Sequence, residues 1–128
     1  MIRWLKKLSG RRLNRPENLV ESIVALGHIL SVEDKECFKE WSEEKSVAKL
    51  HHSLGRWIRN NWGLWDENSK LSKWFKGRGI WHADDMSLII ITSYCRKTKG
   101  QPIKLQDQIQ GYIKYWSELG LQNEAETR

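Results

Sequence analysis

Residues 43–60 carry the clearest helical periodicity in the chain, and this pattern constrains the fold more than any other. A helix over this segment gathers one histidine and five apolar residues on one face: Val47, Leu50, His51, Leu54, Trp57 and Ile58. A narrow flank beside that face contains Gly55 and Arg59. Because glycine has no side chain, another element can approach closely there. Asn60 and Asn61 are poor helix formers, so we expect the helix to end at this pair.

Four other segments show the same period of apolar residues and predict helices. The first follows Pro16, which suits the first turn of a helix. Ser31 with Asp34 three residues later resembles a capping box, and Ser69 has a residue type preferred at the N-cap. These signals predict helices over residues 17–30, 31–41, 70–76 and 105–119.

Residues 83–97 fit either a helix or a strand. The run 88–92 is rich in β-branched residues and would suit a buried strand. Asp84 and Asp85, however, fit the first turn of a helix, and the basic residues before Gly100 fit its last turn. We therefore predict a helix. The fold class that follows is all-α, a compact single-domain bundle of about five to six helices with a basic N-terminal arm.

The arm and the body differ in charge. The chain has a formal net charge of +6. Its length of 128 residues suits one domain with a sizeable core. We assign residues 1–16 to the arm, 17–120 to the helical domain, with its C-terminal amphipathic helix at 104–119, and 121–128 to a polar tail. Residues 17–44 hold eight acids against two lysines, so an acidic patch separates the arm from a basic body.

The arm contains apolar residues between its basic ones, and three interpretations stay open. Its basic residues are Arg3, Lys6, Lys7, Arg11, Arg12 and Arg15. As an amphipathic helix with Trp4 it would make peripheral contact with an anionic membrane surface. As an extended segment it would grip nucleic acid. The third interpretation is a solvated terminus with no binding role.

Membrane insertion and secretion are not indicated. No apolar run approaches the ~20 residues that a membrane-spanning helix needs. No apolar core or small-residue cleavage site of a signal peptide follows the basic N-terminus. Cys37 and Cys95 lie far apart and outside any CxxC pair, so we expect free thiols. These features predict a cytoplasmic protein.

Two motifs resemble those of a family of small, mostly bacterial helical domains of unknown function. The first is LHxxLGxxIRNxWGLW at residues 50–65, and the second is H(P/A)DDMS at residues 82–87, where Ala83 replaces the proline usual in the family. The resemblance extends over about residues 17–100. It implies a compact helical domain and no known chemistry, with the arm and the C-terminal helix lying outside the family-like part.

Polar residues of the two motifs predict a structural cluster of His51, Arg59, Asp84 and Asp85. A buried arginine beside a glycine must find an anion, and acids at the start of the 83–97 helix could supply one. This pair most simply pins one helix to another; the other interpretation is a polar pocket for a small ligand or a partner.

His51, His52 and His82 are ligand types that zinc accepts. Their spacing is not HExxH, and neighbours on a helix point about 100° apart, so we predict no metal site.

Eight tryptophans divide between core and surface. Trp57 and Trp116 lie on apolar faces, and we expect both in the core. Four others flank turns and alternate with basic residues, which is typical of a stacking surface or of a packed core with a basic rim. The predicted binding surface consists of Arg56, Arg59, Asn60, Trp62, Trp65, Trp74 and Trp81.

These residues favour a non-enzymatic binding or adaptor module with a protein partner, carried by a bacterium or by a mobile element such as a phage. The first alternative is a nucleic-acid-binding protein that uses the basic arm and body. The second is a metal-dependent or small-molecule enzyme. No nucleophile–base pair, phosphate-binding loop or cofactor motif is present in the sequence, so we predict no catalytic residue and no cofactor.

Overall fold

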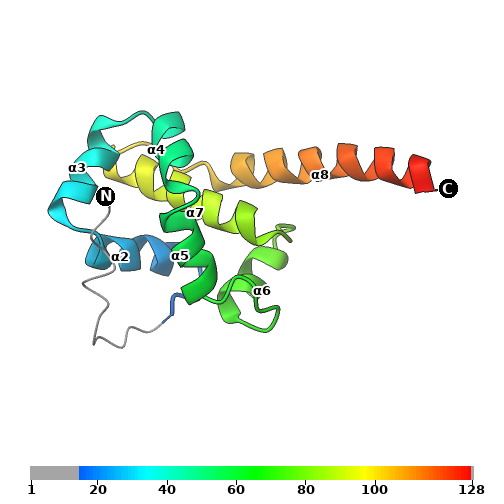
Figure 1. Ribbon diagram of the computed structural model, residues 1–128, viewed down its shortest axis with the longest axis horizontal. Coiled ribbons are helices and arrows are strands. Elements are labelled where there is room, and N and C mark those ends of the chain that lie inside the picture. The colour runs from blue at the N-terminus through cyan, green and yellow to red at the C-terminus, as the bar shows by residue number, and fades with distance from the viewer. Residues whose placement is uncertain (1–14, 128) are drawn as a thin grey trace.

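The computed structural model describes residues 15–127 of the chain, with side chains up to residue 120. Within these limits it contains seven α-helices and no strand, which confirms the all-α class. In chain order they are α2 (Leu19–Ile29), α3 (Val32–Glu40), α4 (Glu43–Leu50), α5 (Leu54–Asn61), α6 (Lys70–Lys76), α7 (Ala83–Thr98) and α8 (Leu105–Thr127) (Figure 1). Of the predicted arm, Arg3, Lys6, Lys7, Arg11 and Arg12 lie outside the described residues, and Arg15 is exposed.

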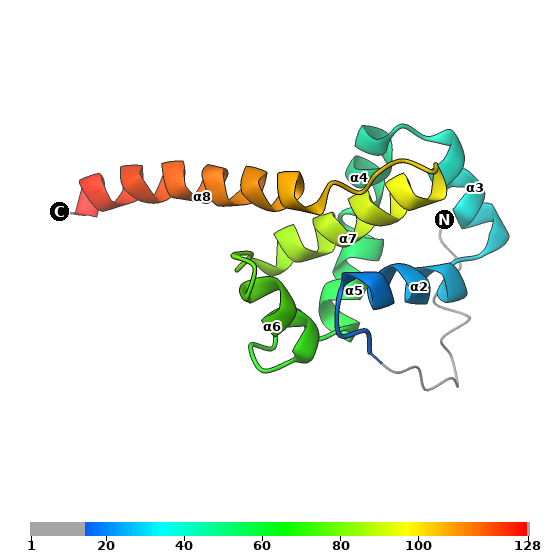
Figure 2. The same cartoon turned by 180° about the vertical axis from the view of Figure 1, so that it is seen from behind.

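The core is built around α7, which contacts each of the other six helices (Figures 1 and 2). Ten of its sixteen residues are buried, so the helix is surrounded on nearly all sides. This explains its β-branched run, because a fully enclosed helix needs apolar residues all round rather than on one stripe. The prediction of a helix over 83–97 is confirmed, with Asp84 and Asp85 in its first turn.

Local capping signals place the starts of three helices. Ser31 and Asp34 form the capping box at α3, with Asp34 N–H donating to the Ser31 hydroxyl at 3.1 Å. Ser69 caps α6 in the same way, through the Ser72 N–H at 3.1 Å. Both predicted caps are confirmed. The first predicted helix, however, begins at Leu19 rather than near Pro16, because the Asn18 side chain accepts a hydrogen bond from the Glu21 N–H and sets the start.

The predicted helix over 43–60 is wrong as a single element. It is interrupted at residues 51–53, so that α4 and α5 are separate and the helices within residues 15–127 number seven rather than five to six. Ser53 leaves the helical conformation, with φ −98° and ψ −80°. The interruption frees the His51 carbonyl, which accepts hydrogen bonds from the Arg59 guanidinium. A buried arginine therefore takes an acceptor that a continuous helix would have used for itself.

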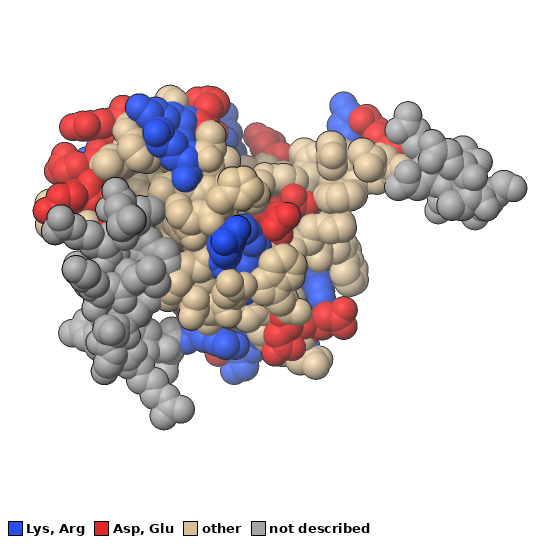
Figure 3. Space-filling model, in the orientation of Figure 1, with Lys and Arg blue, Asp and Glu red and all other residues tan. Residues whose placement is uncertain are grey.

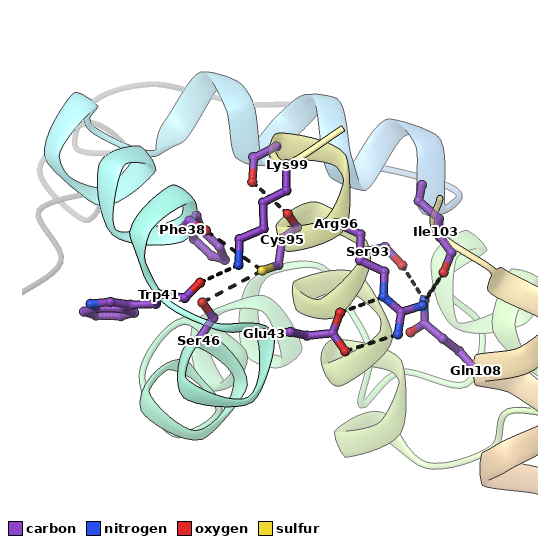
Figure 4. A network of polar contacts seen from close by, with 11 residues as sticks. Phe38, Trp41, Glu43, Ser46, Ser93, Cys95, Arg96, Lys99, Ile103 and Gln108 are labelled. Carbon is purple, nitrogen blue, oxygen red and sulfur yellow. Dashed lines mark hydrogen bonds and ion pairs between the residues drawn. The ribbon is translucent and has the colours of Figure 1, made fainter. Parts of the chain in front are cut away.

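Arg96 of α7 and Lys99, which directly follows the helix, hold its C-terminal end to the segments around it (Figure 4). Arg96 forms a two-pronged ion pair with Glu43 of α4, at 2.7 and 3.1 Å, and donates to the Ile103 carbonyl at 2.6 Å. Lys99 donates to the Trp41 carbonyl between α3 and α4. Cys95 is buried and Cys37 half-buried, and both thiols are free. These contacts fix the place where the chain turns from α7 into α8.

Helix α8 runs antiparallel beside α7 and then extends beyond the body (Figures 1 and 2). It continues to Thr127, past the predicted end at 119 and through the predicted tail. Ile109 is buried against the core. Trp116, expected in the core, is 38% exposed, and it lies beside the first turn of α7, where its ring stacks on His82 and its indole N–H reaches Asp85. None of the described helices is long and apolar enough to cross a membrane.

Candidate functional site

Arg59 of α5 lies at the centre of the predicted polar cluster and is only 6% exposed. Its Nη1 donates to the Ser87 hydroxyl at 2.8 Å and to the His51 carbonyl at 3.4 Å. Its Nε lies 3.3 Å from Asp84 Oδ1, an ion pair without a well-aligned hydrogen bond. Ser87 in turn donates to the Asp84 carbonyl at 2.9 Å. The guanidinium therefore joins α5, the 51–53 turn and the first turn of α7.

Gly55 provides the space for this arginine. A Cβ added at Gly55 would lie 2.9 Å from Arg59 Nη1 and 3.6 Å from Ile91 Cδ1 of α7. The first distance is shorter than real carbon–nitrogen contacts, so the guanidinium would have to move away from Ser87. The close approach predicted on this flank of the helix is thus present, and its function is to let Arg59 lie between α5 and α7.

The two neighbouring aspartates have different partners. Asp84 faces Arg59 and keeps 58% of its side chain exposed. Asp85 is 8% exposed and accepts a hydrogen bond from the Trp116 indole at 2.7 Å. Burial raises the pKa of Asp85, although the indole hydrogen bond and the nearby His82 oppose the shift. Asp85 is therefore not an ion-pair partner of Arg59 and belongs with α8.

The histidines do not form a metal site. His51 is half-buried, and its pKa is lowered, first by desolvation and then by the charge of Arg59, so its imidazole is neutral at pH 7. His82 stacks on Trp116, with ring centroids 3.8 Å apart. Among the residues that the structure describes, no three His, Cys, Asp or Glu side chains are grouped so as to hold a metal ion.

A cleft lies between α7 and α8, with α4 and the 51–53 turn at its edge. It consists of two adjoining hollows of about 620 and 400 Å³, and Asp85, Tyr112 and Trp116 line both. The larger hollow is also lined by Glu43, His51, Asp84, Leu88, Thr92, Arg96, Asp107, Gln108, Gly111 and Tyr115. Its carboxylates come from three helices, and Figure 3 shows acidic side chains beside the first turns of α8 and at the start of α7. We call this space the α7–α8 cleft.

The predicted tryptophan surface is divided by the fold. Trp65 and Trp81 are 62% and 66% exposed, and Arg56 and Asn60 are exposed beside them in the sequence. Trp74 is half-buried, with the Arg78 guanidinium 3.8 Å from its ring centroid. Arg59 and Trp62 are buried and therefore do not belong to the surface. Trp62 lies in the core, and Trp57 packs against it from the edge of the core. The two rings meet edge-on, with their centroids 5.7 Å apart.

Several residues of these sites were not predicted as site residues from the sequence, among them Ser87, Asp107, Tyr112, Tyr115 and Trp116. Ser87 is three residues after Asp84 and thus on the same side of α7, a spacing that could have placed it beside Arg59. Asp107 and Trp116 carry no such signal, because their position depends on how α8 crosses α7.

A family model described as "Domain of unknown function (DUF6794)" matches residues 15–98, which run from before α2 to the last residue of α7. Helix α8 lies outside the matched segment. No curated protein and no solved structure matches the chain.

Proposed function

The chain belongs to this family of domains of unknown function, and we propose that it is a non-enzymatic module that binds a protein partner through its exposed tryptophans. We define the tryptophan edge as Arg56, Asn60, Trp65, Trp74, Arg78 and Trp81. It is a narrower surface than the sequence predicts, since Arg59 and Trp62 are excluded by burial. A bacterial or phage origin stays a prediction from the sequence.

The exposure of Trp65 and Trp81 is the observation that carries this proposal. Apart from them and Trp116, the large apolar side chains that the structure leaves exposed are three valines and Tyr115. A tryptophan that stays in water forgoes a large burial energy, and tryptophan is among the residues that dominate binding energy when a partner covers it.

Trp65 is also held in place before any partner arrives. Its indole N–H donates to Asn60 Oδ1 at 2.8 Å, and Asn60 is the next-to-last residue of α5. An anchor that is already oriented loses less conformational entropy on binding. Trp74, stacked between Phe75 and the Arg78 guanidinium, is similarly fixed.

Site-specific photo-crosslinking in cells tests the proposal. A crosslinking residue at position 65 should capture a protein that the same residue at Val20, an exposed position on α2, does not capture. The captured protein is then purified and its Kd measured. We expect Trp65→Ala and Trp81→Ala each to weaken binding by about 2 kcal/mol, roughly 30-fold. The matched variant Val20→Ala should leave Kd unchanged, and equal binding by all three variants would contradict the proposal.

Binding of nucleic acid is the alternative that a specific observation favours. Two rings of the tryptophan edge have cations over them: Arg78 over Trp74, and Lys76 over Trp81 at 5.8 Å. Stacked bases and bound phosphates use the same combination. A gel shift with unrelated DNA and RNA distinguishes the two functions. Binding at low salt that falls steeply with added salt and is lost in Trp81→Ala would favour nucleic acid over protein.

A further inference from the structure

The described residues that line the α7–α8 cleft carry more negative than positive charge, even though Arg96 lies near Asp107. Two of its four carboxylates have cationic partners, since Glu43 pairs with Arg96 and Asp84 with Arg59. Neither Asp85 nor Asp107 forms an ion pair with any residue that the structure describes. The excess charge thus lies on one buried and one exposed carboxylate, both facing the same space.

The buried member of this pair is unusual in its surroundings. Asp85 is more than nine-tenths buried, yet its one hydrogen bond comes from a neutral donor, the Trp116 indole. A carboxylate in such a place normally has a positive charge beside it. Asp85 also lines both hollows of the cleft, so a group entering either one can reach it.

Aromatic rings form the wall opposite α7. Tyr112, Tyr115 and Trp116 lie within two turns of α8, and Trp116 is backed by the stacked ring of His82. Aromatic faces attract organic cations, and they also bury the aliphatic stem that carries the charge. The larger hollow, of about 620 Å³, has the size typical of small-ligand sites.

We propose that the α7–α8 cleft binds an organic cation, an alkylammonium or guanidinium group on an aliphatic stem, with Asp85 and Asp107 as counter-ions and Tyr112, Tyr115 and Trp116 around the stem. The cation is either a free amine or the side chain of a basic peptide. Helix α8, which supplies Asp107 and the aromatic residues, lies outside the segment that matches the family model. The cleft shares Trp81, which lines its smaller hollow, with the tryptophan edge, whereas Trp65 lines neither hollow.

NMR titration of the whole chain tests the proposal, with the Trp116 indole N–H signal as the reporter. The probes are acetyl-arginine amide, its neutral isostere acetyl-citrulline amide, and spermidine. We expect the arginine probe, spermidine or both to shift the Trp116 signal at millimolar concentration, and the citrulline probe to leave it unchanged. A response to spermidine alone identifies a free polyamine, and a response to the arginine probe alone identifies a peptide side chain.

Charge-neutral variants locate the binding site. Asp85→Asn keeps the shape and the indole hydrogen bond, and we expect it to weaken binding of the responding cation at least tenfold. Asp107→Asn should weaken it several-fold. The matched control Glu36→Gln removes one exposed carboxylate on α3, outside the cleft, and should change Kd less than twofold.

The proposal is overturned by any of three results: no cation shifts the Trp116 signal, citrulline acts as well as arginine, or Asp85→Asn and Glu36→Gln have equal effects. None of these readouts uses a variant of Trp65 or Trp81, and Trp65 lines neither hollow. The effect of Trp65→Ala on protein binding and the effect of Asp85→Asn on cation binding can therefore fail or succeed independently.

Discussion

Asp84 and Asp85 are adjacent carboxylates at the start of α7, and they differ in burial and in their partners. Asp84 lies near a buried guanidinium, and its charge is compensated. Asp85 is buried beside an indole, and burial raises its pKa above the ordinary value of 3.8. As pH rises from 3.8 through the pKa in the folded state, the unfolded chain releases this proton first. The free energy of unfolding therefore decreases over that interval, and the loss is complete above the folded pKa.

We expect Asp85→Asn to be more stable than the wild type at neutral pH, because the amide keeps the hydrogen bond from Trp116 without a buried charge. The difference should shrink as pH falls through the folded pKa and should be smallest well below 3.8, where the wild-type carboxyl is itself protonated in both states. Urea unfolding at a series of pH values measures it. Asp84→Asn is the matched control, and it should cost about 1 kcal/mol because Arg59 loses its anionic partner. A less stable Asp85→Asn with no narrowing in acid would contradict this account.

At the scale of the helix, Gly55 is a point of close approach between α5 and α7, since a Cβ there would lie 3.6 Å from Ile91 Cδ1. Gly55→Ala would force Arg59 off Ser87, and we expect a loss of about 1–3 kcal/mol in the free energy of unfolding. Gly27 of α2 is the matched position, because a Cβ there meets nothing within 4 Å. Gly27→Ala should therefore stabilise the protein by about 0.5–1 kcal/mol through helix propensity. Urea denaturation of both variants measures the contrast, and effects of the same sign would show that Gly55 has no packing role.

Arg96 is the link between α4, α7 and the start of α8. Arg96→Lys keeps the charge but cannot reach both Glu43 oxygens and the Ile103 carbonyl at once. We expect a loss of about 1–2 kcal/mol. A double-mutant cycle with Glu43→Gln should give a coupling energy of about 1 kcal/mol. A coupling energy of zero would mean that the ion pair does not contribute to the free energy of unfolding.

These elements also show what the sequence can and cannot predict. Ser31, Ser69 and the helix over 83–97 were predicted because capping and helix-end charge act within a few residues of the chain. The interruption at 51–53 could not be predicted, because the apolar periodicity continues through it. What accompanies the interruption is a hydrogen bond from Arg59 to the His51 carbonyl, eight residues earlier in the chain. The Arg59–Asp84 pair follows from residue types, whereas the place of Asp85 depends on the path of α8.

At the scale of the whole molecule, the segment that matches the family ends with α7, and α8 is added along one side of it. The core residues of α2 to α7 pack around α7, and α8 covers this core only with Leu105, Ile109, Tyr112 and Ile113 among the residues that the structure describes. By contrast, the α7–α8 cleft requires both parts, since Asp84 and Asp85 come from α7 while Asp107 and the aromatic wall come from α8. Folding and cation binding should therefore be separable.

A chain ending at Lys104 tests this separation. We expect it to remain helical and to unfold cooperatively, with a loss of about 2–4 kcal/mol from the uncovered contacts of Ile109, Tyr112 and Ile113. That loss is smaller than the 5–15 kcal/mol typical of a domain, so the remainder should stay folded. Circular dichroism and urea denaturation measure both quantities. The shortened chain should also lose its response to the cationic probes, followed by the amide signals of Asp84 and Asp85. Retained binding would place the cation elsewhere, and loss of cooperative unfolding would show that α8 is part of the folding unit rather than an addition to it.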